Sequence, residues 1–302
     1  GERQVVYYPT GPGQEPLLEA FTQAFPEIEL QYKYTLGAEL AAILDTEEAT
    51  GQRAIDLAQG GATVQLRLQA NGRQDAWPFP EGSGIPAEVG FFGNEMFTNG
   101  RSIAGITYNT NRLKPEDIPQ TLDEFFTPEW KGRVAIQKPT GAQTVDNSLT
   151  ILRENGLITP EQIANLADFP IEAGNVAVLT AVAQGKYDIG LWNSSTALAP
   201  LVKQGAPLAK LAPPTIATAQ NDVFCILKNC PHPRAARLLA GWLLSRPGQA
   251  YFPQAGVYSI YDDIPPPGFL PDLTGVELKI ANYDTFSDQA RATREITVQY
   301  WP

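Results

Sequence analysis

The sequence predicts an α/β fold in which a mostly parallel sheet carries helices on its faces. Strand-like and helix-like segments alternate over the first sixty residues, and turn-forming glycines and prolines separate them. Polar loops follow several of the strands. The chain has 302 residues, of which 43% are hydrophobic and 18% charged, and these are values of a globular protein with one large or two ordinary domains.

The first half of the chain supports this class element by element. Residues 4–8 (QVVYY) are β-branched and aromatic and end at PTGPG, as a short strand does. Residues 14–25 place apolar side chains at helical spacing, and Pro26 ends that helix. The next expected elements are a strand over 28–34, a helix over 36–44, and a strand that runs from 54 into a glycine turn at 60–61. Residues 72–100 show few periodic signals.

The second half repeats the alternation. The expected strands cover 102–113, 133–137, 187–192 and 221–227, and the expected helices cover 147–155, 159–169, 174–185 and 232–245. We expect Thr159 to be the N-cap of its helix, with Pro160 in the first turn, and Asn175 to cap the following helix. Gly185 is expected to end that helix.

Four polar loops stand at strand ends, where open α/β sheets bind their ligands. They cover residues 9–13, 59–63, 139–144 and 193–196. In the KPTGAQT stretch, free backbone N–H groups and the Thr140 hydroxyl would form an anion-sized pocket at the positive end of a helix dipole. An ordinary helix N-cap explains the same residues, and both interpretations stay open here and for 193–196.

Composition excludes several classes of function. The net charge of −11 argues against a nucleic acid or an anionic membrane as partner. No apolar run approaches the eighteen or so residues of a membrane helix. One histidine, His232, and two cysteines, Cys225 and Cys230, nearly exclude an ordinary zinc site, and we expect a structural or exposed histidine. The cysteines are either buried thiols or a disulfide.

The sequence also lacks the common catalytic motifs. It contains no G-x-S-x-G elbow, no P-loop, no dinucleotide-binding G-x-G-x-x-G and no H-E-x-x-H. The carboxylates of Glu95, Asp262 and Asp263 are expected to be surface charges. Cys225 is the one candidate nucleophile, and it falls on an expected core strand. We therefore expect neither enzymatic activity nor a cofactor.

Five stretches of the chain together resemble a known family. They are VVYYPTG…EPLLEAFTQAFPEIELQY, GRSIAGITYNTNRL, TLDEFFTPEWKGRVAIQKPTGAQT, VAVLTAVAQGKYDIGLWN and HPRAARLLAGWLLSRPGQAYF. In this order they are similar to the solute-binding proteins of bacterial ABC importers, and most similar to the ferric-ion-binding group. The most specific pieces are GITYNTNRL, TPEWKGRVAI and the P-[TS]-G turn that follows them.

The resemblance covers nearly the whole chain and implies a two-lobed periplasmic-binding-protein fold of type II. Each lobe is then a mixed, mostly parallel sheet flanked by helices, with a ligand cleft between lobes that close about a hinge. It implies a monomer in the periplasm, or lipid-anchored outside the cytoplasmic membrane, that was exported by a removed signal peptide and serves an ABC transporter permease. The expected lobes are residues 1–104 with 225–270 and residues 105–224 with 271–302, with hinge crossings near 104–108 and 221–226.

The resemblance also implies which ligands of iron are missing. In the ferric proteins, a histidine, a carboxylate and a tyrosine pair hold the metal. The histidine falls near Gly11, the carboxylate near Gly60 or Gly61, and the tyrosine pair on Ser195 and Thr196. Ferric iron needs several anionic oxygen donors, which these residues do not supply.

The elements that hold a synergistic anion in the ferric proteins are, by contrast, retained. They fall on Arg101, Thr140, Gly141 and Ala142. Backbone N–H groups and a guanidinium suit an oxyanion. We therefore predict a protein that binds a small anionic organic solute: a phosphonate, phosphate ester, sulfonate or carboxylate. The expected ligand-binding residues are Tyr8, Thr10, Gly11, Gly60, Gly61, Thr63, Arg101, Thr140, Gly141, Ala142, Trp192, Asn193, Ser195 and Thr196. Of these, the aromatic rings of Tyr8 and Trp192 are expected to line the sides of the site as its walls.

Three alternatives stay open at the level of the sequence. Ferric iron or another cation would use Tyr7, Tyr8 or Tyr258 in a rearranged site. A polyamine-like cation would lie in an aromatic box with Tyr8, Trp192 and Glu95. An enzyme on the same fold would depend on Cys225.

Overall fold

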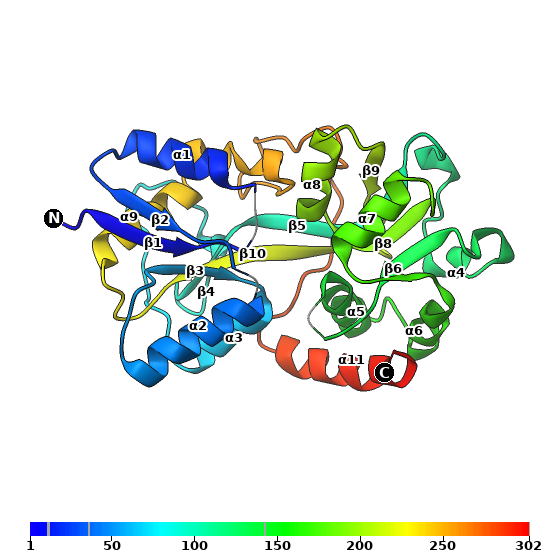
Figure 1. Cartoon of the computed structure of the whole chain (residues 1–302), viewed down its shortest axis with the longest axis horizontal. Coiled ribbons are helices and arrows are strands. Elements are labelled where there is room, and N and C mark those ends of the chain that lie inside the picture. The colour runs from blue at the N-terminus through cyan, green and yellow to red at the C-terminus, as the bar shows by residue number, and fades with distance from the viewer. Residues whose placement is uncertain (11–12, 36, 142, 302) are drawn as a thin grey trace. The chain divides into compact units, whose positions relative to one another are not determined.

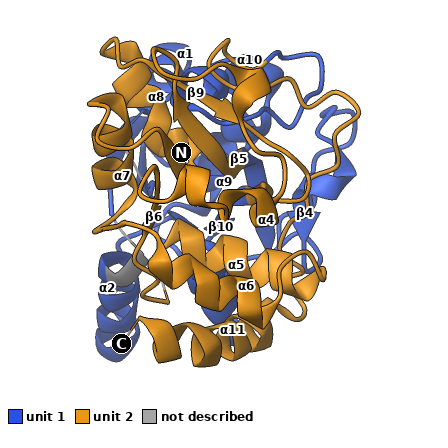
Figure 2. Ribbon diagram, turned by 90° about the vertical axis from the view of Figure 1, so that its right-hand side faces the viewer, with its two compact units in different colours: residues 1–101, 221–265 blue, residues 102–220, 266–302 orange. Residues whose placement is uncertain are grey.

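The computed structural model describes residues 1–10, 13–35, 37–141 and 143–301 (Figure 1). The chain divides into two compact units, unit 1 with residues 1–101 and 221–265 and unit 2 with residues 102–220 and 266–302 (Figure 2). Each unit therefore combines segments that are far apart in the sequence. The lobe boundaries drawn from the sequence, near 104, 224 and 270, stay a prediction.

Unit 1 is built on a mixed sheet. Its strands are β1 (Gln4–Tyr8), β2 (Glu29–Tyr32), β3 (Leu57–Gly60), β4 (Gly90–Phe91) and the unit 1 parts of β5 (Met96–Asn109) and β10 (Thr218–Ile226). Strand β1 pairs in parallel with β2 and β3, whereas β10 pairs antiparallel with β3, and β4 antiparallel with β5. The carboxyl ends of β1 and β3 consequently lie at one edge of this sheet.

Helices cover both faces of the unit 1 sheet. In Figure 1, α1 (Glu15–Ala24) lies above these strands, and α2 (Gly37–Thr50) and α3 (Ala62–Ala70) lie below them. The unit also contains α9 (Pro233–Leu244) and α10 (Arg246–Gln249). Helix α1 buries Leu17, Leu18 and Phe21, which confirms the helical spacing of its apolar residues.

Unit 2 has a second set of parallel strands. Its strands are β6 (Val134–Gln137), β7 (Ile171–Glu172), β8 (Ile189–Ser194), β9 (Leu208–Leu211) and the remaining parts of β5 and β10. Strand β6 pairs in parallel with β7 and β8, and β5 pairs antiparallel with β8 and β9. The helices are α4 (Leu122–Phe125), α5 (Thr144–Glu154), α6 (Pro160–Asn165), α7 (Asn175–Ala183), α8 (Ser195–Lys203) and α11 (Phe286–Tyr300).

Short 3₁₀ turns complete the two units. They are η1 (Ala87–Val89), η2 (Pro115–Asp117), η3 (Pro128–Trp130), η4 (Leu166–Asp168) and η5 (Phe252–Ala255). Each unit has its own apolar core, which contains side chains such as Phe21, Phe97 and Phe224 in unit 1 and Ile136 and Leu149 in unit 2. The burial of such apolar side chains is the main contribution to the stability of a fold.

Most predicted elements are confirmed, and the differences lie at their ends. The hydroxyl of Thr159 accepts from the backbone N of Gln162 and caps α6, as predicted. Strand β5 begins at Met96, inside the segment without periodic signals, because both of its faces are buried and no alternation marks it. The N-cap of α7 is Gly174 rather than Asn175, whose side chain has other partners.

Candidate functional site

The carboxyl ends of the parallel strands of unit 2 lead into three helix N-termini. Strands β6, β7 and β8 precede α5, α7 and α8, respectively. Such an edge is where open α/β sheets bind ligands. We call it the unit 2 edge, and it comprises Gln137, Thr140, Thr144, Asn175, Asn193, Ser194 and Thr196.

The side chain of Asn175 ties the unit 2 edge together. Its Oδ1 accepts hydrogen bonds from Gln137 Nε2 at 2.7 Å, from Ser194 N at 3.1 Å and from Asn193 Nδ2 at 3.4 Å. Its Nδ2 donates to Thr144 Oγ1 at 2.9 Å. One amide thus links the ends of β6 and β8 to the N-termini of α5 and α7. This network fixes the edge through neutral groups.

In the turn before α5, the backbone N–H groups of Thr140 and Gln143 are not free. The backbone N of Thr140 donates to Asp146 Oδ2 at 3.2 Å, and the N of Gln143 donates to the same oxygen at 2.8 Å. The internal carboxylate of Asp146 therefore occupies the positive end of this helix, as a capping residue does. The sequence had left a cap and an anion site open, and the structure shows the cap. Ala142 lies outside the described residues.

A cation nevertheless lies against this turn. Gly141 has φ +94°, and a Cβ built on it would lie 3.5 Å from Cδ and from Nε of Arg294. The Arg294 Nη1 donates to the carbonyl of Pro139 at 3.1 Å. Thr140 and Gly141 are exposed beside it. Arg294 comes from α11, more than 150 residues away in the sequence, and only the fold reveals this pairing.

The 193–196 stretch divides between strand, cap and exposed hydroxyl. Strand β8 runs on through Asn193 and Ser194, two residues beyond its predicted end. The Ser194 Oγ accepts from Ala197 N at 3.2 Å and caps α8, while Thr196 Oγ1 donates to Ser194 Oγ at 3.1 Å. Ser195 is buried, and its Oγ accepts from Ile103 N at 3.0 Å. The helix-cap interpretation is therefore right for Ser194, and Thr196 is left half-buried at the edge.

Trp192 is not a wall of a binding site, contrary to the prediction. It is fully buried in the core of unit 2, and its Nε1 donates to the carbonyl of Ile216 at 2.9 Å. Its φ of +54° accompanies a register shift between β8 and β5 at Gly105, which turns its indole toward the core. Its burial also removes Trp192 from the proposed aromatic box for a polyamine.

A buried lysine underlies the end of β8. Lys210 is 3% exposed, and its Nζ donates to the carbonyl of Asn193 at 2.6 Å and to Thr107 Oγ1 at 2.9 Å. Both acceptors are uncharged, so burial disfavours the ammonium and lowers the pKa of Lys210 to about 7. Nothing in the local sequence marks Lys210 as buried, because a lysine in a short strand is ordinarily exposed.

The carboxyl ends of β1 and β3 form the corresponding edge of unit 1. We call the predicted residues Tyr8, Thr10, Gly60, Gly61 and Thr63 the unit 1 edge. Tyr8 and Thr10 are half-buried, Gly60 is buried, and Gly61 and Thr63 are exposed. Register places the strand ends together, because Tyr8 pairs with Ala58. Gly11 lies outside the described residues.

Arg101 lies in unit 1 with an exposed side chain. Two hydrogen bonds with Tyr258 fix its backbone. The N of Arg101 donates to the carbonyl of Tyr258 at 3.0 Å, and the carbonyl of Arg101 accepts from the N of Tyr258 at 2.8 Å. No ion pair joins the Arg101 guanidinium to another residue in the described part of the chain. A fixed backbone with an unpaired exposed guanidinium is suited to anion binding.

Tyr7 is a core residue rather than a metal ligand. It is fully buried, and its hydroxyl donates to Gln59 Oε1 at 2.8 Å, with Gln14 Oε1 3.2 Å away. Gln14 Nε2 also donates to Gln59 Oε1 at 2.7 Å. Burial, followed by the charge of Asp222, raises the pKa of Tyr7 well above its ordinary value. The tyrosinate that iron requires is therefore strongly disfavoured at Tyr7.

The cysteines are free, buried thiols. Burial raises the pKa of Cys225 to about 12, so it is not a nucleophile at neutral pH. His232 has a structural role: its backbone N donates to Asp56 Oδ1 at 2.8 Å, and its Nδ1 lies 3.0 Å from Asp56 Oδ2. No group of three or more His, Cys, Asp or Glu side chains arranged to hold a metal occurs among residues 1–10, 13–35, 37–141 and 143–301.

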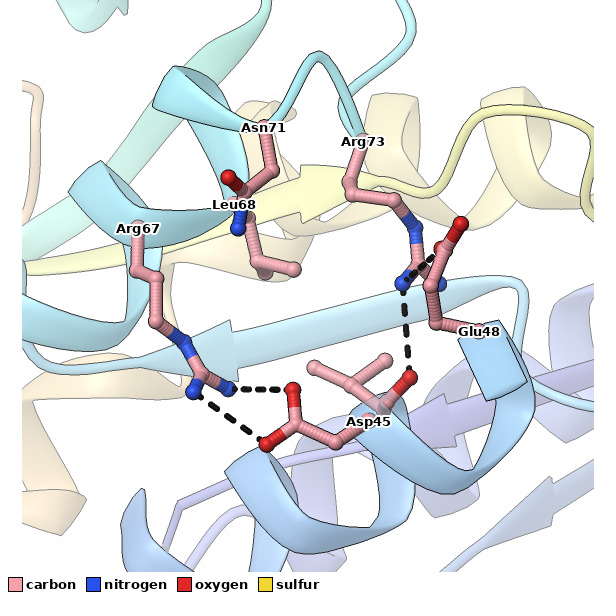
Figure 3. A pocket seen from close by; sticks show the side chains of 7 residues that line it. Asp45, Glu48, Arg67, Leu68, Asn71 and Arg73 are labelled. Carbon is pink, nitrogen blue, oxygen red and sulfur yellow. Dashed lines mark hydrogen bonds and ion pairs between the residues drawn. The ribbon is translucent and has the colours of Figure 1, made fainter.

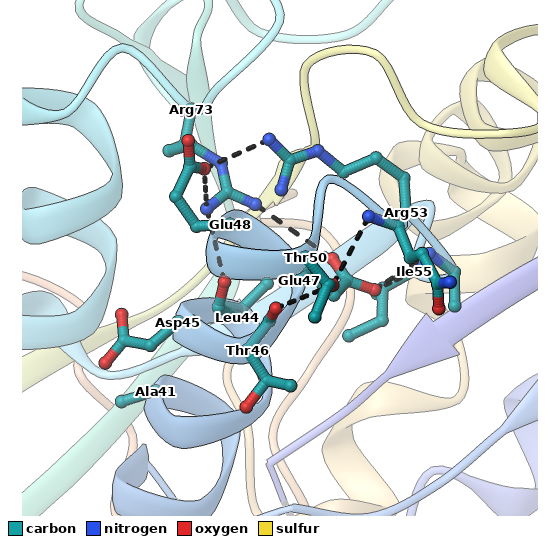
Figure 4. Close-up of polar contacts among 12 residues, drawn as sticks. Ala41, Leu44, Asp45, Thr46, Glu47, Glu48, Thr50, Arg53, Ile55 and Arg73 are labelled. Atoms are coloured by element: carbon teal, nitrogen blue, oxygen red, sulfur yellow. Dashed lines mark hydrogen bonds and ion pairs between the residues drawn. The ribbon is translucent and has the colours of Figure 1, made fainter.

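A cavity of about 370 Å³ lies between α2 and α3 of unit 1 (Figure 3). Its arginines already have partners: Arg67 pairs with Asp45 at 3.1 Å, and Arg73 pairs with Glu48. The neighbouring Glu47 accepts from the backbone N of Ala54 and Ile55 and so fastens the end of α2 to the start of β3 (Figure 4). This cluster of charges is structural.

Four residues at these edges were missed by the sequence analysis. They are Gln137, Asp146, Asn175 and Arg294. Both Asn175 and Asp146 had a local signal, since Asn175 was predicted to cap a helix and Asp146 directly precedes the helix predicted over 147–155. Gln137 ends a buried strand, and nothing in the local sequence distinguishes it from other strand-end polar residues.

The described chain contains no helix that is both long and apolar enough to cross a membrane. A family model for bacterial extracellular solute-binding proteins matches residues 9–250. The chain belongs to this family and has its mixed α/β periplasmic-binding-protein fold of type II. It is the solute-binding component of an ABC importer, and such a component is not an enzyme. No curated protein sequence matches the chain.

Solved structures of similar fold span the whole chain. An apo ferric ion-binding protein A from Pasteurella haemolytica has a TM-score of 0.81 at 15% identity, covering 99% of this chain and 98% of its own. A Trichodesmium protein (IdiA, FutA) with iron and citrate has a TM-score of 0.76 at 19% identity, covering 99% and 100%. AfuA of Actinobacillus pleuropneumoniae with fructose 6-phosphate has a TM-score of 0.74 at 20% identity, covering 99% and 97%.

Proposed function

We propose that this protein binds a small organic solute that carries an oxyanion and a hydroxylated body, and delivers it to the importer's permease outside the cytoplasm. Arg101 and Arg294 attract the oxyanion. Hydroxyls and amides at the two edges contact the rest of the solute. The contacts are Tyr8, Thr10, Gly60, Gly61, Thr63, Thr140, Gly141, Asn193 and Thr196, and Gly11 and Ala142 stay in the set as predictions from the sequence alone.

The observation that carries this proposal is the arginine at the Thr140–Gly141 turn. The turn is exposed, its glycine has no side chain, and the guanidinium of Arg294 lies against it. Asp146 already accepts the hydrogen bonds of Thr140 N and Gln143 N. The guanidinium, rather than a set of unpaired N–H groups, is therefore the stronger attraction for an oxyanion at this place.

The uncharged part of the solute is suggested by the neutral polar groups. Thr196 is half-buried, and Asn193, whose side chain is buried, has an Oδ1 without a partner among the described residues. Hydroxyls and amides of this kind recognise hydroxyl groups. The structure of AfuA, which contains fructose 6-phosphate, shows that the same fold accommodates a polyhydroxy oxyanion.

Ferric iron is the second candidate, because two of the three structures described above are named for iron or ferric-ion binding. Two features of this chain oppose it. Ser195 and Thr196 stand where the resemblance places the tyrosine pair, and Ser195 is buried and hydrogen-bonded to Ile103. Tyr7 is protonated in the core. Neutral hydroxyls do not balance a trivalent cation.

A thermal-shift measurement tests the proposal. The probes are fructose 6-phosphate, inorganic phosphate, fructose, ferric citrate and spermidine. We expect fructose 6-phosphate to raise the melting temperature most, since a hundredfold excess over the dissociation constant adds about 2.7 kcal/mol to stability. Arg294→Ala should reduce this shift, and Arg291→Ala on the same helix, which pairs with Asp288 at 3.3 Å, should not. A shift with fructose or spermidine alone would contradict the oxyanion, and a coloured iron complex would establish the second candidate.

A further inference from the structure

Asn99 on β5 carries a buried amide side chain. It is 0% exposed, and neither its Oδ1 nor its Nδ2 has a hydrogen-bond partner among the residues that the structure describes. Other buried amides, such as Gln74 and Gln137, lack a partner only at the oxygen and still donate through Nε2. An unsatisfied buried polar group costs about 1–3 kcal/mol, and native proteins keep few of them without a reason.

The backbone around Asn99 is held in place while its side chain is left unpaired. The Asn99 carbonyl accepts from Gln249 Nε2 at 2.9 Å. The next residue, Gly100, approaches the neighbouring chain so closely that a Cβ would lie 2.6 Å from the carbonyl oxygen of Tyr258. Arg101 and Tyr258 then exchange two backbone hydrogen bonds. The backbone around Asn99 is therefore fixed by these three hydrogen bonds and by the close approach of Gly100 to Tyr258.

The amide shares a sheet face with a satisfied polar network. The rings of Phe97 and Phe224 lie 5.5 Å apart on the neighbouring strands β5 and β10, so they share one face, and Asn99, two residues from Phe97, shares it too. Gln59 is on this face because it pairs with Phe224. The Tyr7 hydroxyl and Gln14 Nε2 both donate to Gln59 Oε1.

This contrast indicates what Asn99 is for. Where polar groups on this face serve the fold alone, they are paired with each other. Asn99 is not paired, and the surface begins within one or two residues of it, since Arg101 is exposed and Asn221 and Asp222 on β10 are half-buried. Arg101 is the residue expected to attract the oxyanion.

We propose that the side chain of Asn99 contacts the hydroxylated body of the solute, an inference that rests on the proposed function. An amide offers a donor and an acceptor side by side, and a hydroxyl group offers both in return. Asn99 thus selects a solute that has a hydroxyl a short distance from its oxyanion. A bare inorganic anion lacks the hydroxylated body, so the Asn99 amide contributes little to its binding.

The experiment compares two buried asparagines of the same strand. Asn99→Leu replaces the unpaired amide by a larger apolar side chain of the same branched shape, and Asn99→Ala is a second variant that avoids any misfit of leucine. Asn109→Leu is the control, because Asn109 is buried, donates to the carbonyl of Val182 at 2.8 Å and accepts from Asn111 N at 2.9 Å. Binding of fructose 6-phosphate and of inorganic phosphate is measured by calorimetry, and the melting temperature is measured without ligand.

We expect both Asn99 variants to melt no lower than the wild type, while Asn109→Leu melts lower. Fructose 6-phosphate should bind the Asn99 variants at least about tenfold more weakly, a change of 1.4 kcal/mol, and inorganic phosphate should change by less than about twofold. Equal affinity of fructose 6-phosphate for wild type and Asn99 variants overturns the inference and leaves the proposed function standing. If neither fructose 6-phosphate nor inorganic phosphate binds the wild type, the proposed function is contradicted. If, in that case, both Asn99 variants also melt at a lower temperature than the wild type, the amide is structural and held by an enclosed water. That result overturns the inference as well.

Discussion

The carboxyl edges of the two units are built in different ways. The unit 2 edge is a network in which Asn175 joins four partners, Asp146 caps α5 and Ser194 caps α8. The unit 1 edge consists of glycines, threonines and Tyr8, and its exposed residues Gly61 and Thr63 follow directly on a strand end. Asn99, the buried amide that has no partner in the part of the chain that the structure describes, also lies in unit 1.

The difference separates two tasks of a binding protein. Polar groups that are hydrogen-bonded to each other hold a surface in one shape, and this preorganisation lowers the cost of ordering a site on binding. Groups without internal partners are available to a ligand, at a cost to the stability of the unliganded protein. The unit 2 edge is therefore held by internal hydrogen bonds, although Gln137 Oε1 and Asn193 Oδ1 have no partner among the described residues, and unit 1 contributes the amide of Asn99, which has none at either end there. Changes at the unit 2 edge should affect stability first, and changes at the unit 1 edge should affect binding first.

Asn175→Ala should give the largest loss of stability at either edge. It removes an acceptor for Gln137 Nε2 and Ser194 N and a donor to Thr144 Oγ1, and we expect a loss of about 3 kcal/mol in the free energy of unfolding. Thr63→Ala at the unit 1 edge should change it by less than about 0.5 kcal/mol, because Thr63 is exposed. Urea unfolding measures both. Equal effects would erase the distinction between the edges.

Lys210→Met tests the buried ammonium beneath the unit 2 edge. The pKa of Lys210 is lowered from 10.5 to about 7 in the folded protein, so between these values the unfolded chain binds a proton that the folded chain releases. This difference makes stability rise with pH across that window, by at most about 1.4 kcal/mol for each pH unit. Urea unfolding at pH 7, 8 and 9 should show this rise in the wild type.

The same pH series in Lys210→Met should lack this contribution. The methionine keeps most of the volume and removes the charge, so the variant should gain stability relative to the wild type mainly at and below pH 7, where the ammonium is charged in the fold. A pH profile identical to that of the wild type would mean that another group titrates.

Asp146→Asn should have a smaller effect, and on binding rather than on folding. The asparagine oxygen still accepts from Thr140 N and Gln143 N, so the cap is kept and the unfolding free energy should change by less than about 1 kcal/mol. Loss of the negative charge should tighten binding of fructose 6-phosphate by about three- to tenfold, since like charges near each other repel. Weaker binding after this change would indicate a cationic solute.

Much of the fold follows from the sequence, because its signals are local. The apolar spacing of α1 and the Thr159 cap of α6 each depend on neighbours a few residues away. The ends of β5 and β8 were placed wrongly for a physical reason. Both strands are buried on both faces, so Met96 and Asn193 show no alternation that would mark them as part of a strand.

The site was harder to predict, because its partners come from distant elements. The turn at Thr140 looks like an anion pocket until the carboxylate of Asp146 is seen to cap it. Arg294, which restores a positive charge there, lies on the last helix. Trp192 was expected at a strand end, and the strand runs two residues further and turns its indole into the core. Local sequence patterns predicted correctly where the candidate loops lie, but not which groups the loop residues form hydrogen bonds with.

The central claim is tested most directly by calorimetric titration of fructose 6-phosphate into the wild type and into Arg101→Ala. Fructose is the uncharged control ligand. An oxyanion solute predicts that fructose 6-phosphate binds the wild type, that fructose binds at least about a hundredfold more weakly, and that Arg101→Ala weakens fructose 6-phosphate by a similar factor. Fructose binding as tightly as fructose 6-phosphate, or an Arg101→Ala variant with unchanged affinity, would contradict the claim.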